Sequence, residues 1–126
     1  MRGQSYFLMR ILPASAMAIA PLIVHADNFG NVRYDGQTDQ LYITMLYRGT
    51  NPNHQFSLNW GECQTDPNDN GSQVAADVLD NQFDDPAEKD FKKTFAVSLH
   101  DLPCQRPLKL TLRTAPRFFY TLTIPN

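Results

Sequence analysis

The sequence predicts an all-β fold, a small antiparallel β-sandwich, and two patterns carry this prediction. Short segments alternate apolar with polar side chains at a period of two, as strands do when they bury one face. Clusters of Gly, Pro, Asn and Asp separate these segments and supply turns, as in Gly49-Thr50-Asn51-Pro52-Asn53. About six or seven strands in about 100 residues suit two packed sheets.

The predicted strands differ in how many faces they bury. Segment 41–47 is apolar on both faces, which predicts a central strand, whereas 32–34 predicts a short edge strand. Segments 108–113 and 118–124 alternate cleanly and predict a hairpin around Ala115-Pro116. The remaining alternating segments are 55–60 and 94–100. Together these strands predict a sandwich of immunoglobulin-like type, with a small β-barrel as the alternative.

The middle of the chain is ambiguous. Val74 to Leu79 fits either a strand or a helical turn, because the spacing of its apolar residues suits both periods. Asp85-Pro86-Ala87-Glu88 places an acid at an N-cap, proline at the first helical position and glutamate at the third. This pattern predicts a short helix near 86–93.

The first 26 residues have the pattern of a cleavable signal peptide. Met1 to Arg10 contains two arginines and no acid, and Ile11 to Val24 contains no charged residue. The apolar run is too short to cross a bilayer, which takes about 20 residues, so we expect no membrane insertion. Val24-His25-Ala26 suits cleavage after Ala26. We therefore predict a single domain over 27–126 that is secreted or periplasmic.

The predicted mature chain is acidic. Of the 11 Lys and Arg residues, Arg2 and Arg10 lie in the leader, which leaves 9 against 13 Asp and Glu, a net charge of −4. Binding to nucleic acid rests on a basic footprint, so the charge argues against such a partner. The oligomeric state is left open by the composition.

The two cysteines, Cys63 and Cys104, both lie in the mature chain. Export places them in an oxidising compartment, which predicts a disulfide bond. They lack a Cys-x-x-Cys spacing and a neighbouring histidine, which argues against a redox or metal-binding pair.

One segment formally fits a calcium-binding loop, and calcium is the only cofactor that the sequence suggests. The candidate ligands are Asp66, Asn68, Asn70 and Asp77, with Gly71 at the sharp turn. Gln73 stands where an apolar residue is normal, and Asp77 is shorter than the usual glutamate. The same residue types build any solvated loop, and that interpretation is preferred.

A basic stripe is the first candidate for a partner-binding surface. Residues 77–90 have a net charge of −5, whereas 91–126 have a net charge of +5. Lys109 and Arg113 share the outward face of one predicted strand, and Arg117 follows nearby. The alternative is that the acidic segment packs against this stripe or that both are merely solvated.

Phe119 is the apolar candidate for the same surface. It points away from the face that carries Tyr120 and Leu122, so it is either exposed beside the basic stripe or covered by the middle segment. An exposed aromatic among arginines is typical of protein-binding surfaces.

The sequence contains little that indicates a catalytic site. His54 and His100 are not at metal-ligand spacing, and lone histidines are expected at the surface. No serine has a nucleophile-elbow context. We therefore expect a non-enzymatic binding or interaction protein, of which an inhibitor would be a special case. A calcium-binding module is the alternative, and a hydrolytic enzyme ranks last.

Two short motifs resemble loops of the chagasin-type cysteine-protease inhibitors, which are immunoglobulin-like. They are Asn51-Pro52-Asn53, before the strand that ends in Trp60, and Arg106-Pro107. The match covers five residues and lacks the threonines, the tryptophan after Arg-Pro and the glycine-rich loop of that family. The resemblance would imply an inhibitory surface built from these loops.

Overall fold

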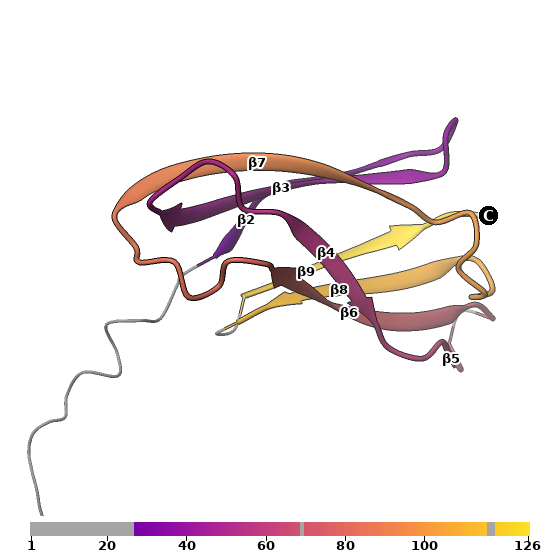
Figure 1. Ribbon diagram of the computed structural model, residues 1–126. Helices are drawn as coiled ribbons and strands as arrows, with labels where there is room; N and C mark the ends of the chain where they lie inside the picture. The colour runs from indigo at the N-terminus through magenta and orange to yellow at the C-terminus, as the bar shows by residue number, and fades with distance from the viewer. Residues whose placement is uncertain (1–26, 69, 116–117) are drawn as a thin grey trace, which may run out of the picture.

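The computed structural model describes residues 27–126 except 69 and 116–117. Within these residues the chain is all-β and contains no helix (Figure 1). Two sheets pack against each other, and they do not close into a barrel, so the barrel alternative was wrong. No helix in the described part is long and apolar enough to cross a membrane. The predicted signal peptide, 1–26, lies outside the described residues.

The strands divide into a sheet of three and a sheet of five. The first has the order β2-β3-β7, with bounds β2 (Asn28–Asp35), β3 (Gln40–Gly49) and β7 (Lys89–Ser98). The second has the order β4-β6-β8-β9, with the short β5 paired to β6. Its bounds are β4 (Phe56–Trp60), β5 (Gln64–Thr65), β6 (Ser72–Asp80), β8 (Leu108–Thr114) and β9 (Phe118–Ile124).

The second sheet departs from the purely antiparallel prediction at one pair. Strands β6 and β8 are parallel neighbours, from Ser72 opposite Leu108 to Asp77 opposite Arg113. Between them the chain runs through β7 in the other sheet, and such a crossover permits the parallel direction that a tight hairpin cannot. The predicted hairpin is confirmed, because β8 and β9 pair antiparallel along their whole lengths.

The predicted helix near 86–93 was wrong, because β7 begins at Lys89. This strand pairs with β3 over ten residues, from Gly49 opposite Lys89 to Gln40 opposite Ser98. The carboxylate of Asp85, expected to cap a helix, instead accepts a hydrogen bond from the backbone N–H of Thr50 at 2.7 Å. A full strand ladder outweighs a local capping signal. Segment 74–79, left open between strand and helix, is part of β6.

The core lies between the two sheets and follows the predicted alternation. Strand β3 is central in its sheet, as predicted, and its buried residues are Leu41, Ile43, Met45 and Tyr47. Strand β8 supplies Leu108, Leu110 and Leu112 from the other sheet. Burying such side chains contributes about 1.5–3 kcal/mol each, so this cluster is the main source of stability.

The predicted disulfide is confirmed. Cys63, just after β4, is bonded to Cys104, and their Cα atoms are 5.4 Å apart. Cys104 belongs to the irregular segment 99–107 between β7 and β8. The bond therefore ties a segment without ladder hydrogen bonds to the end of the second sheet.

Candidate functional site

The outer face of β6, β8 and β9 brings together three of the predicted partner-binding residues. Lys109 and Arg113 project from the same side of β8, and Phe119 is the cross-strand neighbour of Arg113 on β9. Phe119 is 60% exposed, so the interpretation that leaves it uncovered is the one the structure bears out. Arg117 lies outside the described residues.

A hollow of about 440 Å³ opens at the apolar end of this face. Leu79, 48% exposed, and Phe119 both line it. Arg113 also lines it and is held by Asp77, with Nε to Oδ1 at 2.8 Å and Nη2 to Oδ2 at 3.3 Å. The other lining residues are Val78, Thr114 and Ala115. We name this hollow with its rim the Phe119 surface.

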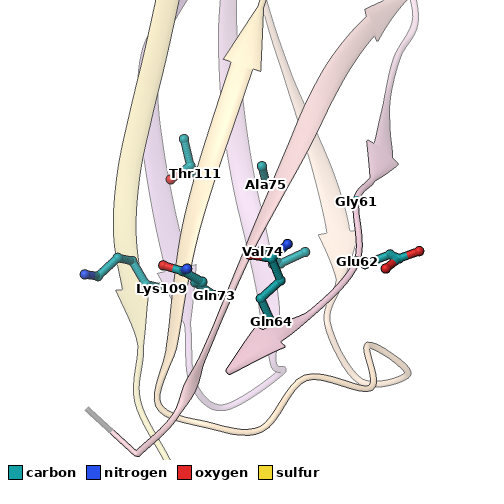
Figure 2. A pocket seen from close by; sticks show the side chains of 8 residues that line it. All are labelled: Gly61, Glu62, Gln64, Gln73, Val74, Ala75, Lys109 and Thr111. Carbon is teal, nitrogen blue, oxygen red and sulfur yellow. The ribbon is translucent and has the colours of Figure 1, made fainter. Parts of the chain in front are cut away.

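The opposite end of the same face is polar. A second hollow, of about 340 Å³, lies here. Figure 2 shows its lining, with Gln73 and Lys109 on neighbouring strands and Gln64 beside them. The ammonium of Lys109 lies 3.8 Å from Asp66. The remaining lining residues are Gly61, Glu62, Val74, Ala75 and Thr111. The basic stripe is therefore partly neutralised by Asp66 and Asp77, of which only Asp77 belongs to the acidic segment 77–90.

The structure does not gather the calcium candidates around one point. Asp66 is buried and its Oδ1 accepts a hydrogen bond from the N–H of Asn68 at 3.0 Å. Asp77 lies five residues beyond the start of β6, about 16 Å along the strand, and binds Arg113. The carbonyl of Asn70 accepts from Gln105. Among the described residues no three His, Cys, Asp or Glu side chains form a group that could hold a metal ion.

A buried charge cluster lies where β6 ends, at Asp80, and sequence reasoning missed it. The ring of His54 is fully buried, whereas it was expected at the surface. Its Nδ1 lies 2.8 Å from Asp80 Oδ2, and its Nε2 lies 2.7 Å from Asp85 Oδ2. The ring of Tyr47 stacks on it with 4.3 Å between centroids. We name His54, Asp80, Asp85 and the neighbouring Asp27 the His54 cluster.

The electrostatics of the His54 cluster favour a charged imidazole. Burial alone would lower the pKa of His54, but hydrogen bonds to Asp85 and Asp80 and their charges outweigh it and raise that pKa. Hydrogen bonds from the Thr50 side chain and from His54 lower the pKa of Asp85 to about 2. Burial, followed by the charge of Asp80, raises the pKa of Asp27 to about 7. Both ring nitrogens of His54 are thus bonded to carboxyl groups, and the ring is enclosed within the fold.

No local spacing in the sequence points to this cluster. His54 lies in the segment before β4, whereas Asp80 ends β6 and Asp85 follows it, so the partners are 26 and 31 residues away. The close approach depends on Gly49, where an added Cβ would lie 2.5 Å from Asp85 Oδ2 and 2.8 Å from His54 Nε2.

Gly49→Ala is therefore expected to destabilise the fold by about 1–3 kcal/mol, because the new methyl group would push the imidazole and the carboxylate apart. Urea unfolding followed by tryptophan fluorescence would measure the change. Gly36→Ala is the matched control, since its Cβ would meet only the Tyr34 ring at 3.6 Å. Equal midpoints for the two variants would contradict the tight packing at Gly49.

The two loops of the inhibitor resemblance lie at opposite ends of the sandwich. Asn51 donates to Gln82 at 2.9 Å where β3 ends, whereas Arg106 binds Asp39 where β3 begins. The ten residues of β3 separate these ends by about 30 Å. One inhibitory surface therefore cannot use both loops.

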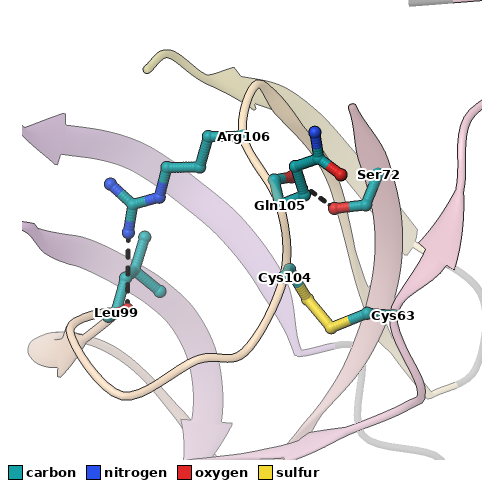
Figure 3. The surroundings of a disulfide bond; sticks show 6 residues. All are labelled: Cys63, Ser72, Leu99, Cys104, Gln105 and Arg106. Atoms are coloured by element: carbon teal, nitrogen blue, oxygen red, sulfur yellow. Dashed lines mark hydrogen bonds between the residues drawn. A yellow bond between two sulfur atoms is a disulfide. The ribbon is translucent and has the colours of Figure 1, made fainter. Parts of the chain in front are cut away.

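Arg106 has a local structural role instead. Its guanidinium bonds both oxygens of Asp39, at 2.8 and 2.9 Å. It also donates to the carbonyl of Leu99, as Figure 3 shows beside the disulfide. Ser72 donates to the carbonyl of Gln105 in the same view. The arginine and the disulfide thus hold segment 99–107 against both sheets.

No protein-family model, curated protein or solved structure matches this chain.

Proposed function

We propose that the mature chain is an exported, non-enzymatic interaction protein that binds a protein partner through the Phe119 surface. The observation that carries the proposal is the pair of large exposed apolar side chains, Phe119 and Leu79, on the rim of one hollow. Contiguous exposed apolar side chains with polar neighbours mark interaction sites. Aromatic residues and arginine are also the residue types that dominate binding energy at interfaces.

The chemistry of the surface suggests the kind of partner. The hollow accepts an apolar side chain between Leu79 and Phe119. Arg113 remains 44% exposed beside Asp77, so it offers charge to an acidic group next to that side chain. We therefore expect a partner segment that combines an apolar residue with a carboxylate.

Export and a non-catalytic role are parts of the same proposal. The disulfide supports an oxidising compartment, either the periplasm or the extracellular medium. Strands that alternate between two packed sheets support an immunoglobulin-like type. The enclosure of His54 removes a candidate general base. The calcium hypothesis lacks comparable support, because Asp77 binds Arg113 and lies about 16 Å along β6 from its start, away from the other three candidates.

Phe119→Ser is expected to reduce partner binding at least tenfold, because it removes the central apolar contact, about 1.4 kcal/mol or more. Mature protein carrying a photo-crosslinking phenylalanine analogue at position 119 should trap the partner in its own compartment, and the captured protein then serves for titration against wild type and variant.

Phe83→Ser is the matched control for this test. Phe83 is 72% exposed but lies in the turn after β6 and does not line the hollow. The Phe83→Ser variant should retain wild-type affinity for the partner, and both variants should keep the wild-type melting temperature. Equal loss of binding in the two variants, or none in either, would refute the assignment to the Phe119 surface.

A further inference from the structure

Asp27 is an acidic residue held inside the protein at the start of the described chain. It is only 9% exposed, and its carbonyl accepts a buried hydrogen bond from the hydroxyl of Thr114 at 3.1 Å. This bond joins it to the end of β8 and fixes its position. Its carboxylate oxygen Oδ1 is enclosed and has no hydrogen-bond donor among the described residues.

The surroundings of that oxygen are rich in negative charge. The Asp27 carboxyl is in hydrogen-bond contact with the Asp80 carboxyl, whose Oδ2 binds His54. Asp85 binds the other nitrogen of His54. The cluster thus combines three carboxyl groups with a single imidazole.

Four cations of the described residues, Arg48, Arg106, Lys109 and Arg113, pair with acids outside this cluster. The ion pairs that these cations form within the described residues involve Asp39, Asp66, Asp77 and Asp90. None of those acids belongs to the His54 cluster. Burial, followed by the charge of Asp80, makes the Asp27 carboxyl costly to ionise and raises its pKa to about 7, so a positive charge beside it would stabilise the ionised form.

The predicted cleavage would create such a charge at this place. Hydrolysis of the Ala26–Asp27 amide by a signal peptidase adds one water, leaving a carboxylate on Ala26 and an ammonium on Asp27. That nitrogen is attached to the Cα of Asp27, three bonds from the carboxyl carbon of the side chain, so covalent geometry keeps it within about 5 Å of the residue's own carboxylate. Before cleavage the same nitrogen is a neutral amide.

We propose that the α-ammonium of Asp27 is the counter-ion of the buried Asp27 and Asp80 carboxyls, so that removal of the leader completes the fold. The inference rests on the predicted cleavage after Ala26, which belongs to the proposed export. Export processing would then do more than release the protein, because it adds an ion pair that the precursor cannot form. The leader-bearing chain would be less stable than the mature chain.

Two chains with defined starts test this proposal. One begins at Asp27 and the other at Ala26, each released from a fusion by a protease that leaves no extra residue. In the second chain the ammonium belongs to Ala26, so it lies one residue, about 3.8 Å, further from the Asp27 backbone. The Asp27 chain should melt at least about 5 °C higher at pH 7. The extended chain should also lose stability as the pH rises from about 4 to 7, because its Asp27 carboxyl must ionise unpaired, whereas the Asp27 chain should not.

Two controls make the result specific. Asp27→Asn should remove the difference in melting temperature between the two chains. A chain beginning at His25 should have the same melting temperature as the Ala26 chain. The α-amino pKa of the Asp27 chain, measured by NMR, should lie above the ordinary range of about 7.7–8.0. Equal melting of the Asp27 and Ala26 chains, or an ordinary α-amino pKa, would overturn the proposal, even if Asp27→Asn does not fold. Both chains are made in vitro, so this outcome is independent of where cells cut and of partner binding.

Discussion

Changing Cys63 to Ser is expected to lower the free energy of unfolding by about 4 kcal/mol. The bond closes a loop with a sequence separation of 41, and the loss of chain entropy in the unfolded state accounts for this magnitude. A domain of this size has a total stability of about 5–15 kcal/mol. Guanidinium unfolding of the oxidised protein, with and without the substitution, would measure the change.

Cys104→Ser and the double variant are the controls for the disulfide. All three variants lose the same covalent bond, so they should unfold at nearly the same midpoint. Thiol titration of denatured wild type should find no free thiol. Two titratable thiols, or a double variant as stable as the wild type, would contradict a structural disulfide.

The structure shows which part of the fold depends on this bond. Segment 99–107 has no strand ladder, yet it carries Leu99, which is fully buried, and Arg106, which binds Asp39. Without the disulfide this segment keeps the Arg106 contacts and scattered hydrogen bonds. These are the bond from the Ser72 hydroxyl to Gln105, the bond from the Ser72 N–H to Pro107, the bond from the Leu99 N–H to Asp39 and the bond from Gln105 to Asn70. Hydrogen exchange should therefore speed up first at 99–107 in the variants.

His54→Ala is expected to destabilise the fold by about 3–5 kcal/mol. The substitution removes a fully buried imidazolium and leaves Asp80 and Asp85 without their partner, and an uncompensated buried charge has a cost of this size. It also leaves a cavity beside the Tyr47 ring. Urea unfolding at several pH values would measure the loss.

The pH dependence separates the ion pair from simple packing. The folded pKa of His54 is raised above 6.5, so its contribution is full below that pH and falls as the pH rises through the folded value. The pKa of Asp85 is lowered from 3.8 to about 2, so its contribution is full above about pH 4 and is lost on acidification toward pH 2. The difference between wild type and variant should be largest between these limits.

His100→Ala is the matched control, because His100 is exposed and its hydrogen bond to Ser98 is donated by the backbone N–H. Its ring acts on Asp39 through charge alone. It should change stability by less than about 0.5 kcal/mol. Equal unfolding midpoints for the His54 and His100 variants would show that the buried ring contributes no ion pair. A loss of unfolding free energy in His54→Ala that does not vary with pH would show the same.

Local side-chain patterns determined much of the fold. Alternation at a period of two is imposed by the strand itself, so β3, β4, β8 and β9 could be placed from sequence. The same rule put Arg113 and Phe119 on one outward face, because a hairpin fixes its own register. Two cysteines allow a single intramolecular pairing, and the structure has that pair.

Contacts between distant segments were decided only by the tertiary structure. Residues 86–93 carry a helix-start signal, but the ladder with β3 supplies many more hydrogen bonds than a cap does. The sequence spacing of Asp66 and Asp77 fits one calcium-binding loop. In the structure the strand β6 extends from Ser72 through Asp77 and separates the two acids. His54 meets Asp80 and Asp85 because the turns after β3 and β6 close on the same end of the sandwich. Sequence spacing encodes which way a strand faces, whereas the meeting of turns depends on how the sheets pack, which no local pattern records.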